Sequence, residues 1–78
     1  MSQVKIYSTP TCHFCHMAKD FFTENKVEYT DYNVAEDLEK RQEMREITGQ
    51  MGVPVIMIGE NVIIGFDEPK IRELLALA

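Results

Sequence analysis

The sequence predicts a small α/β domain in which three helices flank a four-stranded mixed sheet, in the order β-α-β-α-β-β-α. Short apolar, β-branched runs alternate with amphipathic stretches of helical length, and only a tight turn separates the last two runs. The chain has 78 residues, 45% of them hydrophobic, which is enough for a single domain over residues 1–78 with one core. No stretch approaches the roughly 18 consecutive apolar residues of a membrane helix.

The first strand and the first helix are expected on either side of a cysteine pair. Val4–Ser8 is short and rich in strand-forming residues, which predicts a buried strand. Pro10 and Thr11 end this strand, and a helix is expected from there to about Glu24. Five apolar residues recur at helical spacing and are predicted to pack on the core: Phe14, Met17, Ala18, Phe21 and Phe22.

The middle of the chain is expected to supply the second strand and the second helix. Val27–Val34 is β-branched and aromatic, and a strand there should run parallel to the first because a helix connects them. The second helix is expected over Ala35–Thr48, with Gly49 ending it. Its many charges predict a solvated face, or alternatively a docking surface for a reductase, with two ion pairs: Glu36 with Lys40 and Asp37 with Arg41.

A hairpin and a last helix complete the expected order. Val55–Ile58 is a continuous apolar run, residues 59–61 make a tight turn, and Val62–Ile64 is the returning strand. Asp67 is expected to cap the last helix, with Pro69 in its first turn. The apolar stripe of this helix consists of Ile71, Leu74, Leu75 and Ala78.

The only two cysteines, Cys12 and Cys15, stand where the first strand is followed by the first helix. A helix N-terminus presents unpaired N–H groups and a partial positive charge, which favours a thiolate over a thiol. Either Thr11 or Cys12 is expected to be the N-cap, which leaves Cys12 exposed and Cys15 about one turn further in. We therefore expect dithiol redox chemistry, with Cys12 as the attacking nucleophile and Cys15 as the resolving thiol.

The cysteine pair belongs to a series of motifs that spans nearly the whole chain: Tyr7–Cys15, Thr48–Gln50, Val53-Pro54, and a hairpin ending in Gly65 and Asp67. With these motifs the sequence resembles the glutaredoxin family, in particular short bacterial redoxins, some of which supply electrons to ribonucleotide reductase. The resemblance implies a thioredoxin fold and the reduction of protein or low-molecular-weight disulfides. It also implies a cis Val53-Pro54 bond, with the Val53 backbone pairing with the substrate; the alternative is a trans proline that opens an edge strand.

The sequence departs from this family at the glutathione-binding positions. Typical glutaredoxins have proline and tyrosine between the cysteines, where this chain has His13 and Phe14. They also carry a lysine three residues before the first cysteine, which helps to hold the glutathione carboxylate, and this chain has Thr9 there. Only Gly65 remains of a glycine pair before the last helix, while Asp67 stands where the family contacts the glutamyl end of glutathione. The reductant therefore stays open between glutathione and a thioredoxin reductase.

The candidate site thus consists of catalytic and binding residues. Cys12 and Cys15 are the catalytic residues. Six residues are candidates for binding substrate or glutathione: His13, Phe14, Val53, Pro54, Gly65 and Asp67. Met51 either flanks the substrate groove or, as we expect, packs in the interior. We expect no bound cofactor and no metal.

Composition limits the partners. Eight basic against thirteen acidic residues give a net charge of −5 without a basic stripe, so nucleic acid is not an expected partner. The first residues lack the layout of a secretory signal, and we expect a cytoplasmic monomer that does not bind membranes. Its expected partners are disulfide-containing proteins and the reductant.

The cysteine motif also fits other chemistry. Residues 12–16 match Cys-x-x-Cys-His, the attachment motif of c-type haem, although that attachment normally follows export. Thiolates and imidazoles suit zinc or copper, and an iron–sulfur cluster would need two chains or an outside thiol. The alternative function is therefore a non-catalytic thioredoxin-fold protein that binds a metal or an iron–sulfur cluster. His13 either tunes the redox potential or is merely solvated, whereas His16 is expected to be a solvated helix residue.

Overall fold

The computed structural model describes residues 3–77 and contains the predicted elements in the predicted order. The strands are β1 (Val4–Ser8), β2 (Thr30–Asn33), β3 (Val55–Ile58) and β4 (Asn61–Ile64), and the helices are α1 (His13–Glu24), α2 (Leu38–Thr48) and α3 (Glu68–Leu74). The strands form one sheet in the order β2-β1-β3-β4, in which β1 is parallel to β2 and antiparallel to β3. The predicted mixed four-stranded sheet is confirmed. Over residues 3–77, no helix is long and apolar enough to cross a membrane.

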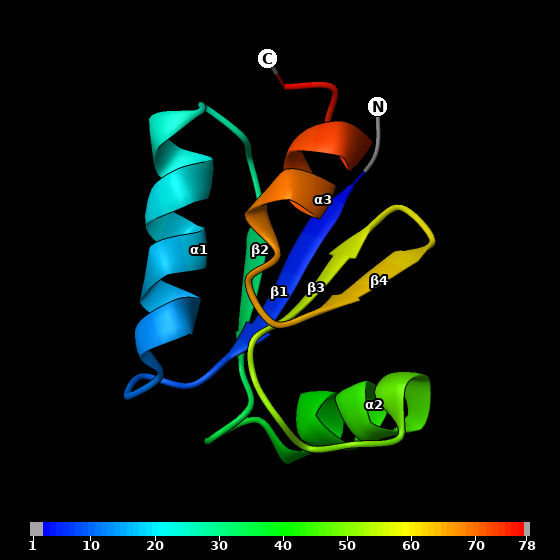
Figure 1. Ribbon diagram of the computed structural model, residues 1–78. Coiled ribbons are helices and arrows are strands. Elements are labelled where there is room, and N and C mark those ends of the chain that lie inside the picture. The colour runs from blue at the N-terminus through cyan, green and yellow to red at the C-terminus, as the bar shows by residue number, and fades with distance from the viewer. Residues whose placement is uncertain (1–2, 78) are drawn as a thin grey trace.

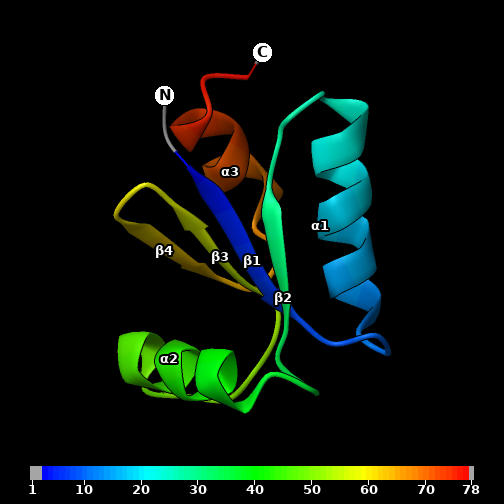
Figure 2. The same cartoon turned by 180° about the vertical axis from the view of Figure 1, so that it is seen from behind.

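The helices cover both faces of the sheet (Figures 1 and 2). α1 and α3 pack on one face, where Phe22 and Ile71 belong to the same buried cluster as Ile56 of β3. α2 packs on the opposite face, where Met44 and Tyr7 share a second buried cluster. Figure 1 shows α2 lying across the end of the sheet at which β1 ends. The start of α1 and the segment between α2 and β3 meet at this same end.

The second strand and the second helix both start later than predicted. β2 begins at Thr30 rather than Val27, because the Val27 N–H donates to the Phe22 carbonyl and closes the turn after α1. α2 begins at Leu38 rather than at residue 35. The Asp37 side chain accepts a hydrogen bond from the N–H of residue 40 and is the N-cap, so the residues before it form a turn. Among the other boundaries, β4 starts one residue early, at Asn61, and Ala78 lies outside the described residues.

Part of the apolar stripe predicted for α1 is wrong. Phe14 and Met17 are 57% and 39% exposed, whereas Cys15, Ala18 and Phe22 are completely buried. An α-helix turns by about 100° per residue, so Met17 points about 200° away from Cys15. The buried face of α1 therefore includes the second cysteine, and the aromatic ring between the cysteines remains on the surface.

The ion pairs predicted along α2 are also wrong. Lys40 pairs with Glu43 at 3.0 Å, and neither Glu36 with Lys40 nor Asp37 with Arg41 forms a salt bridge in the part of the chain that the structure describes. Glu43 also accepts a hydrogen bond of 2.6 Å from the hydroxyl of Tyr7, whose side chain is fully buried. The charges of α2 therefore tie this helix to β1 in addition to facing solvent.

Because of the contact between Tyr7 and Glu43, we expect the protein to lose stability at alkaline pH. Two causes raise the pKa of Tyr7 above its ordinary value: burial, which has the larger effect, and the hydrogen bond to Glu43. The folded protein therefore keeps the Tyr7 proton at a pH where the unfolded chain releases it, and stability falls as the pH rises above about 10. We expect Tyr7 to contribute a slope of up to about 1.4 kcal/mol per pH unit to the free energy of unfolding in that range. Urea denaturation of the wild type and Tyr7→Phe between about pH 8 and 11 measures this contribution.

The matched control is Tyr29→Phe, which removes a hydroxyl from the other face of the sheet. It should keep the alkaline slope of the wild type. A Tyr7→Phe variant with an unchanged slope would show that Tyr7 ionises equally easily in the folded and unfolded chain.

Candidate active site

Cys12 occupies the N-cap of α1, and it is therefore Cys12 rather than Thr11 that begins the helix. Its sulfur accepts a hydrogen bond of 3.2 Å from the backbone N–H of Cys15, while its thiol lies 3.8 Å from the carbonyl oxygen of Val53. The residue is partly exposed. A backbone N–H directed at the sulfur stabilises negative charge there. Cys12 thus presents to solvent a sulfur whose anionic form has a hydrogen-bond donor in place.

Cys15, unlike Cys12, is closed to solvent. Its side chain is fully buried in the first turn of α1. Burial, and secondly the hydrogen bond with Cys12, raises the pKa of Cys15 to about 12. Both cysteines are free thiols in this structure. A disulfide arriving from solvent can reach Cys12 and cannot reach Cys15, which matches the roles of attacking and resolving thiol.

The segment opposite Cys12 contains a cis Val53-Pro54 peptide bond, as the resemblance implies. Pro54 is buried, and its carbonyl oxygen accepts a hydrogen bond of 2.8 Å from the N–H of Gly65. Gly65 has φ = +86°, and a Cβ at this position would meet nothing within 4 Å. Glycine is therefore favoured here by its backbone conformation rather than by lack of space. The structure therefore places Val53 beside the Cys12 sulfur, and Gly65 is hydrogen-bonded to Pro54, the residue after Val53.

The remaining predicted binding residues are exposed, and one of them caps a helix. His13 and Phe14 are exposed on the first turn of α1, and their rings meet edge to face with centroids 5.6 Å apart. Asp67 is exposed, and one of its carboxylate oxygens accepts the N–H of Lys70 and caps α3. His16 is exposed, and its Nε2 lies 2.7 Å from the Pro10 carbonyl oxygen, which ties α1 to the loop before Cys12.

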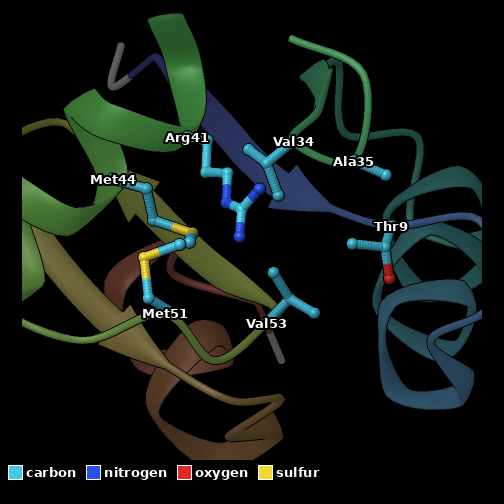
Figure 3. Close-up of a pocket in the computed structure, with 7 residues that line it drawn as sticks. All are labelled: Thr9, Val34, Ala35, Arg41, Met44, Met51 and Val53. Atoms are coloured by element: carbon cyan, nitrogen blue, oxygen red, sulfur yellow. The ribbon is translucent and has the colours of Figure 1, made fainter. Parts of the chain in front are cut away.

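A pocket of about 370 Å³ opens next to Val53, between the loop before Cys12 and α2. Figure 3 shows the guanidinium of Arg41 reaching from α2 into the space between Val34 and Val53. Thr9, at the position of the family's lysine, lines the same pocket. Among residues 3–77 the Arg41 guanidinium forms no salt bridge. The pocket therefore holds a cation that is available to an anionic ligand.

Sequence reasoning missed Arg41 because the i,i+4 spacing on α2 favoured an ion pair with Asp37. A local pattern could not have shown that this side chain turns toward the loop before Cys12. Met51 also differs from the prediction: it is 41% exposed and lines the pocket instead of packing in the interior.

The described residues offer few metal ligands around the cysteines. Over residues 3–77 there is no cluster of three or more His, Cys, Asp and Glu side chains that could hold a metal ion. A metal at Cys12 and Cys15 would need ligands from outside this part of the chain.

A comparison with known proteins identifies the family. The family model described as Glutaredoxin matches residues 4–63 of this chain. The chain belongs to the glutaredoxin family. This glutaredoxin is a thiol–disulfide oxidoreductase of the thioredoxin superfamily, and the family and fold predicted from the resemblance are confirmed.

Individual relatives agree with this assignment. A glutaredoxin-like 8.6 kDa protein in the rubredoxin operon of Clostridium pasteurianum is 44% identical over 92% of this glutaredoxin and 96% of the relative. Glutaredoxin 3 of Escherichia coli strain K12 is 34% identical, covering 87% of this chain and 82% of that protein. The structure of the glutaredoxin-like NrdH-redoxin from Escherichia coli superposes with a TM-score of 0.84 at 25% identity, over 92% of this chain and 93% of that one.

Proposed function

We propose that this glutaredoxin reduces mixed disulfides of glutathione and protein disulfides through the Cys12–Cys15 dithiol. The Cys12 thiolate attacks a substrate sulfur and forms a mixed disulfide, and the other half of the substrate leaves as a thiolate. Cys15 then attacks the Cys12 sulfur, releases the reduced product and leaves a Cys12–Cys15 disulfide, which an external reductant returns to the dithiol. The contrast between an exposed, N–H-stabilised Cys12 and a buried Cys15 carries this proposal.

The surroundings of Cys12 support glutathione as the substrate moiety. The Val53 backbone faces the Cys12 sulfur and is placed to pair with an extended peptide bound through its thiol. Glutathione also carries two carboxylates, and the cation that Thr9 lacks is supplied in the same pocket by Arg41. An arginine pairs with a carboxylate through two parallel hydrogen bonds. Arg41 therefore takes the part of the family's lysine from a different element of the fold.

The experiment that tests the reductant measures NADPH oxidation by the oxidised protein under two conditions. One contains glutathione and glutathione reductase, and the other contains thioredoxin reductase alone. We expect faster turnover with glutathione. Turnover with thioredoxin reductase alone, and none with glutathione, would contradict the choice of reductant while leaving the dithiol chemistry in place. No turnover in either system, nor with a chemical dithiol, would contradict the oxidoreductase proposal itself.

A thioredoxin reductase is the second candidate reductant, and the apolar rim of the site favours it. Phe14 and Ile64 are each 57% exposed, on α1 and at the end of β4. A contiguous exposed apolar patch marks a surface that docks another protein. The NrdH-redoxin that superposes on this chain is described as having a thioredoxin-like activity profile. Electron supply to ribonucleotide reductase and a cytoplasmic location remain predictions.

The proposed role of Arg41 predicts a change in substrate affinity. Arg41→Gln should raise the KM for a glutathione mixed disulfide about tenfold, because it removes one charge-assisted contact, while kcat changes little. Steady-state kinetics with the glutathione system measures both parameters. Arg45→Gln is the control, since it removes an exposed arginine one turn further along α2. If the KM of Arg41→Gln rises no more than that of Arg45→Gln, the glutathione carboxylate binds elsewhere.

The metal-binding alternative has a direct test. Native mass spectrometry of the protein as isolated should give the mass of the polypeptide alone. A stoichiometric metal or iron–sulfur cluster, together with thiols inert to oxidation and reduction, would favour a non-catalytic binding protein.

A further inference from the structure

A polar network joins Ser8 at the end of β1, Lys19 on α1 and Asp31 on β2, and it takes no part in the steps above. The Ser8 hydroxyl, which is almost fully buried, donates a hydrogen bond of 2.6 Å to one carboxylate oxygen of Asp31. The Lys19 ammonium donates to the other oxygen at 2.9 Å. The Lys19 side chain is only 21% exposed. The network thus holds one lysine between α1 and β2, where an unpaired lysine would extend into solvent.

The same lysine acts on Cys15. Lys19 follows Cys15 by four residues on α1, so the two side chains lie on the same face, one turn apart. Burial raises the pKa of Cys15, whereas the Thr9 backbone and the Lys19 ammonium act in the opposite direction. Cys12 is the other ionisable group that acts on Cys15 within residues 3–77, and its effect is to raise the pKa of Cys15. Lys19 is therefore the cation that favours the ionised form of the resolving thiol.

The effect of Lys19 on Cys15 matters when Cys15 resolves the mixed disulfide. Only the thiolate of Cys15 attacks a disulfide, and Cys15 is the thiol that burial keeps protonated. Once Cys12 is bonded to substrate sulfur, it no longer carries a negative charge that opposes ionisation of Cys15. The Lys19 ammonium remains in place, because Asp31 and not the substrate holds it.

We propose that Lys19, held by Asp31 and Ser8, is a positioning residue for the resolving step, where its ammonium stabilises the Cys15 thiolate. This inference rests on the proposed function, since it assumes that Cys15 resolves a mixed disulfide at Cys12. In that step the Cys15 proton leaves to solvent and the Cys15 thiolate attacks the Cys12 sulfur. The Cys12–Cys15 bond forms as the Cys12–substrate bond breaks, and the substrate sulfur leaves as a thiolate that takes up a proton.

The test separates the two steps with an aromatic disulfide that releases one coloured thiolate when Cys12 attacks and a second when Cys15 resolves. In Lys19→Gln we expect the second phase to be about fivefold slower at neutral pH and its pH midpoint to move upward, with the first phase unchanged. Lys19→Met, which keeps the apolar stem, should behave in the same way, and Lys19→Arg should restore the second phase. Lys26→Gln, which removes a cation just beyond the far end of α1, is the control and should behave as the wild type.

A wild-type rate and pH midpoint of the second phase in Lys19→Gln and Lys19→Met would overturn the inference. So would a Lys19→Arg variant as slow as Lys19→Gln, because a cation would then not be what matters. A wild-type protein that releases only one thiolate would instead contradict the proposed function, since Cys15 would not resolve at all. Thermal unfolding of each variant verifies that the rates belong to folded protein.

Discussion

Replacing Cys12 with serine should abolish disulfide reduction, lowering turnover by more than about a thousandfold. Cys12 is the cysteine whose sulfur is open to solvent, and a serine hydroxyl is a far weaker nucleophile at neutral pH. Cys15 cannot take over the attack, because its side chain is fully buried. NADPH-coupled reduction of a glutathione mixed disulfide measures the loss.

The substitution is also structurally mild. Serine is a favoured N-cap residue, and its hydroxyl oxygen can accept the Cys15 N–H that the Cys12 sulfur accepts now. We therefore expect an unchanged far-ultraviolet circular dichroism spectrum, so that lost turnover reports lost chemistry. Normal disulfide reduction by Cys12→Ser would show that the nucleophile has been assigned to the wrong residue.

Replacing Cys15 with serine should trap the reaction at its intermediate. Cys12 still attacks, but no second thiol is in reach to displace the product, so mixed disulfides with protein substrates accumulate. Free glutathione can resolve such an adduct from solvent, and reactions that use it should persist. Non-reducing electrophoresis and mass spectrometry of the protein after incubation with a disulfide-containing substrate measure the adduct.

Two controls make this result specific. The double variant Cys12→Ser with Cys15→Ser should form no adduct, which shows that the trapped bond is made by Cys12. Cys15→Ala tests whether a hydroxyl at a fully buried position disturbs the fold, and it should trap substrates equally well. Absence of any adduct in both single variants would mean that Cys15 is not the resolving thiol.

The sequence predicted most of the fold, because its strands and helices differ in pattern. The short strand-forming runs that became β1 and β3 are the central strands of the sheet, and they are where the prediction matched the structure residue for residue. Errors came at ends governed by capping, as at Asp37, and on faces where an apolar residue is left uncovered, as at Met17. Both depend on contacts that a local pattern does not contain.

By itself the sequence determined the chemistry: two cysteines one helical turn apart at the start of a helix, and a valine-proline pair later in the chain that belongs to the same family pattern. The tertiary structure alone decided which charges serve that chemistry. Arg41 reaches the pocket beside Val53, and Lys19 is held by Asp31 near Cys15. Spacing along the chain places neighbours on one helix, whereas these contacts join α2 to the loop before Cys12 and α1 to β2. Long cationic side chains take their direction from such packing.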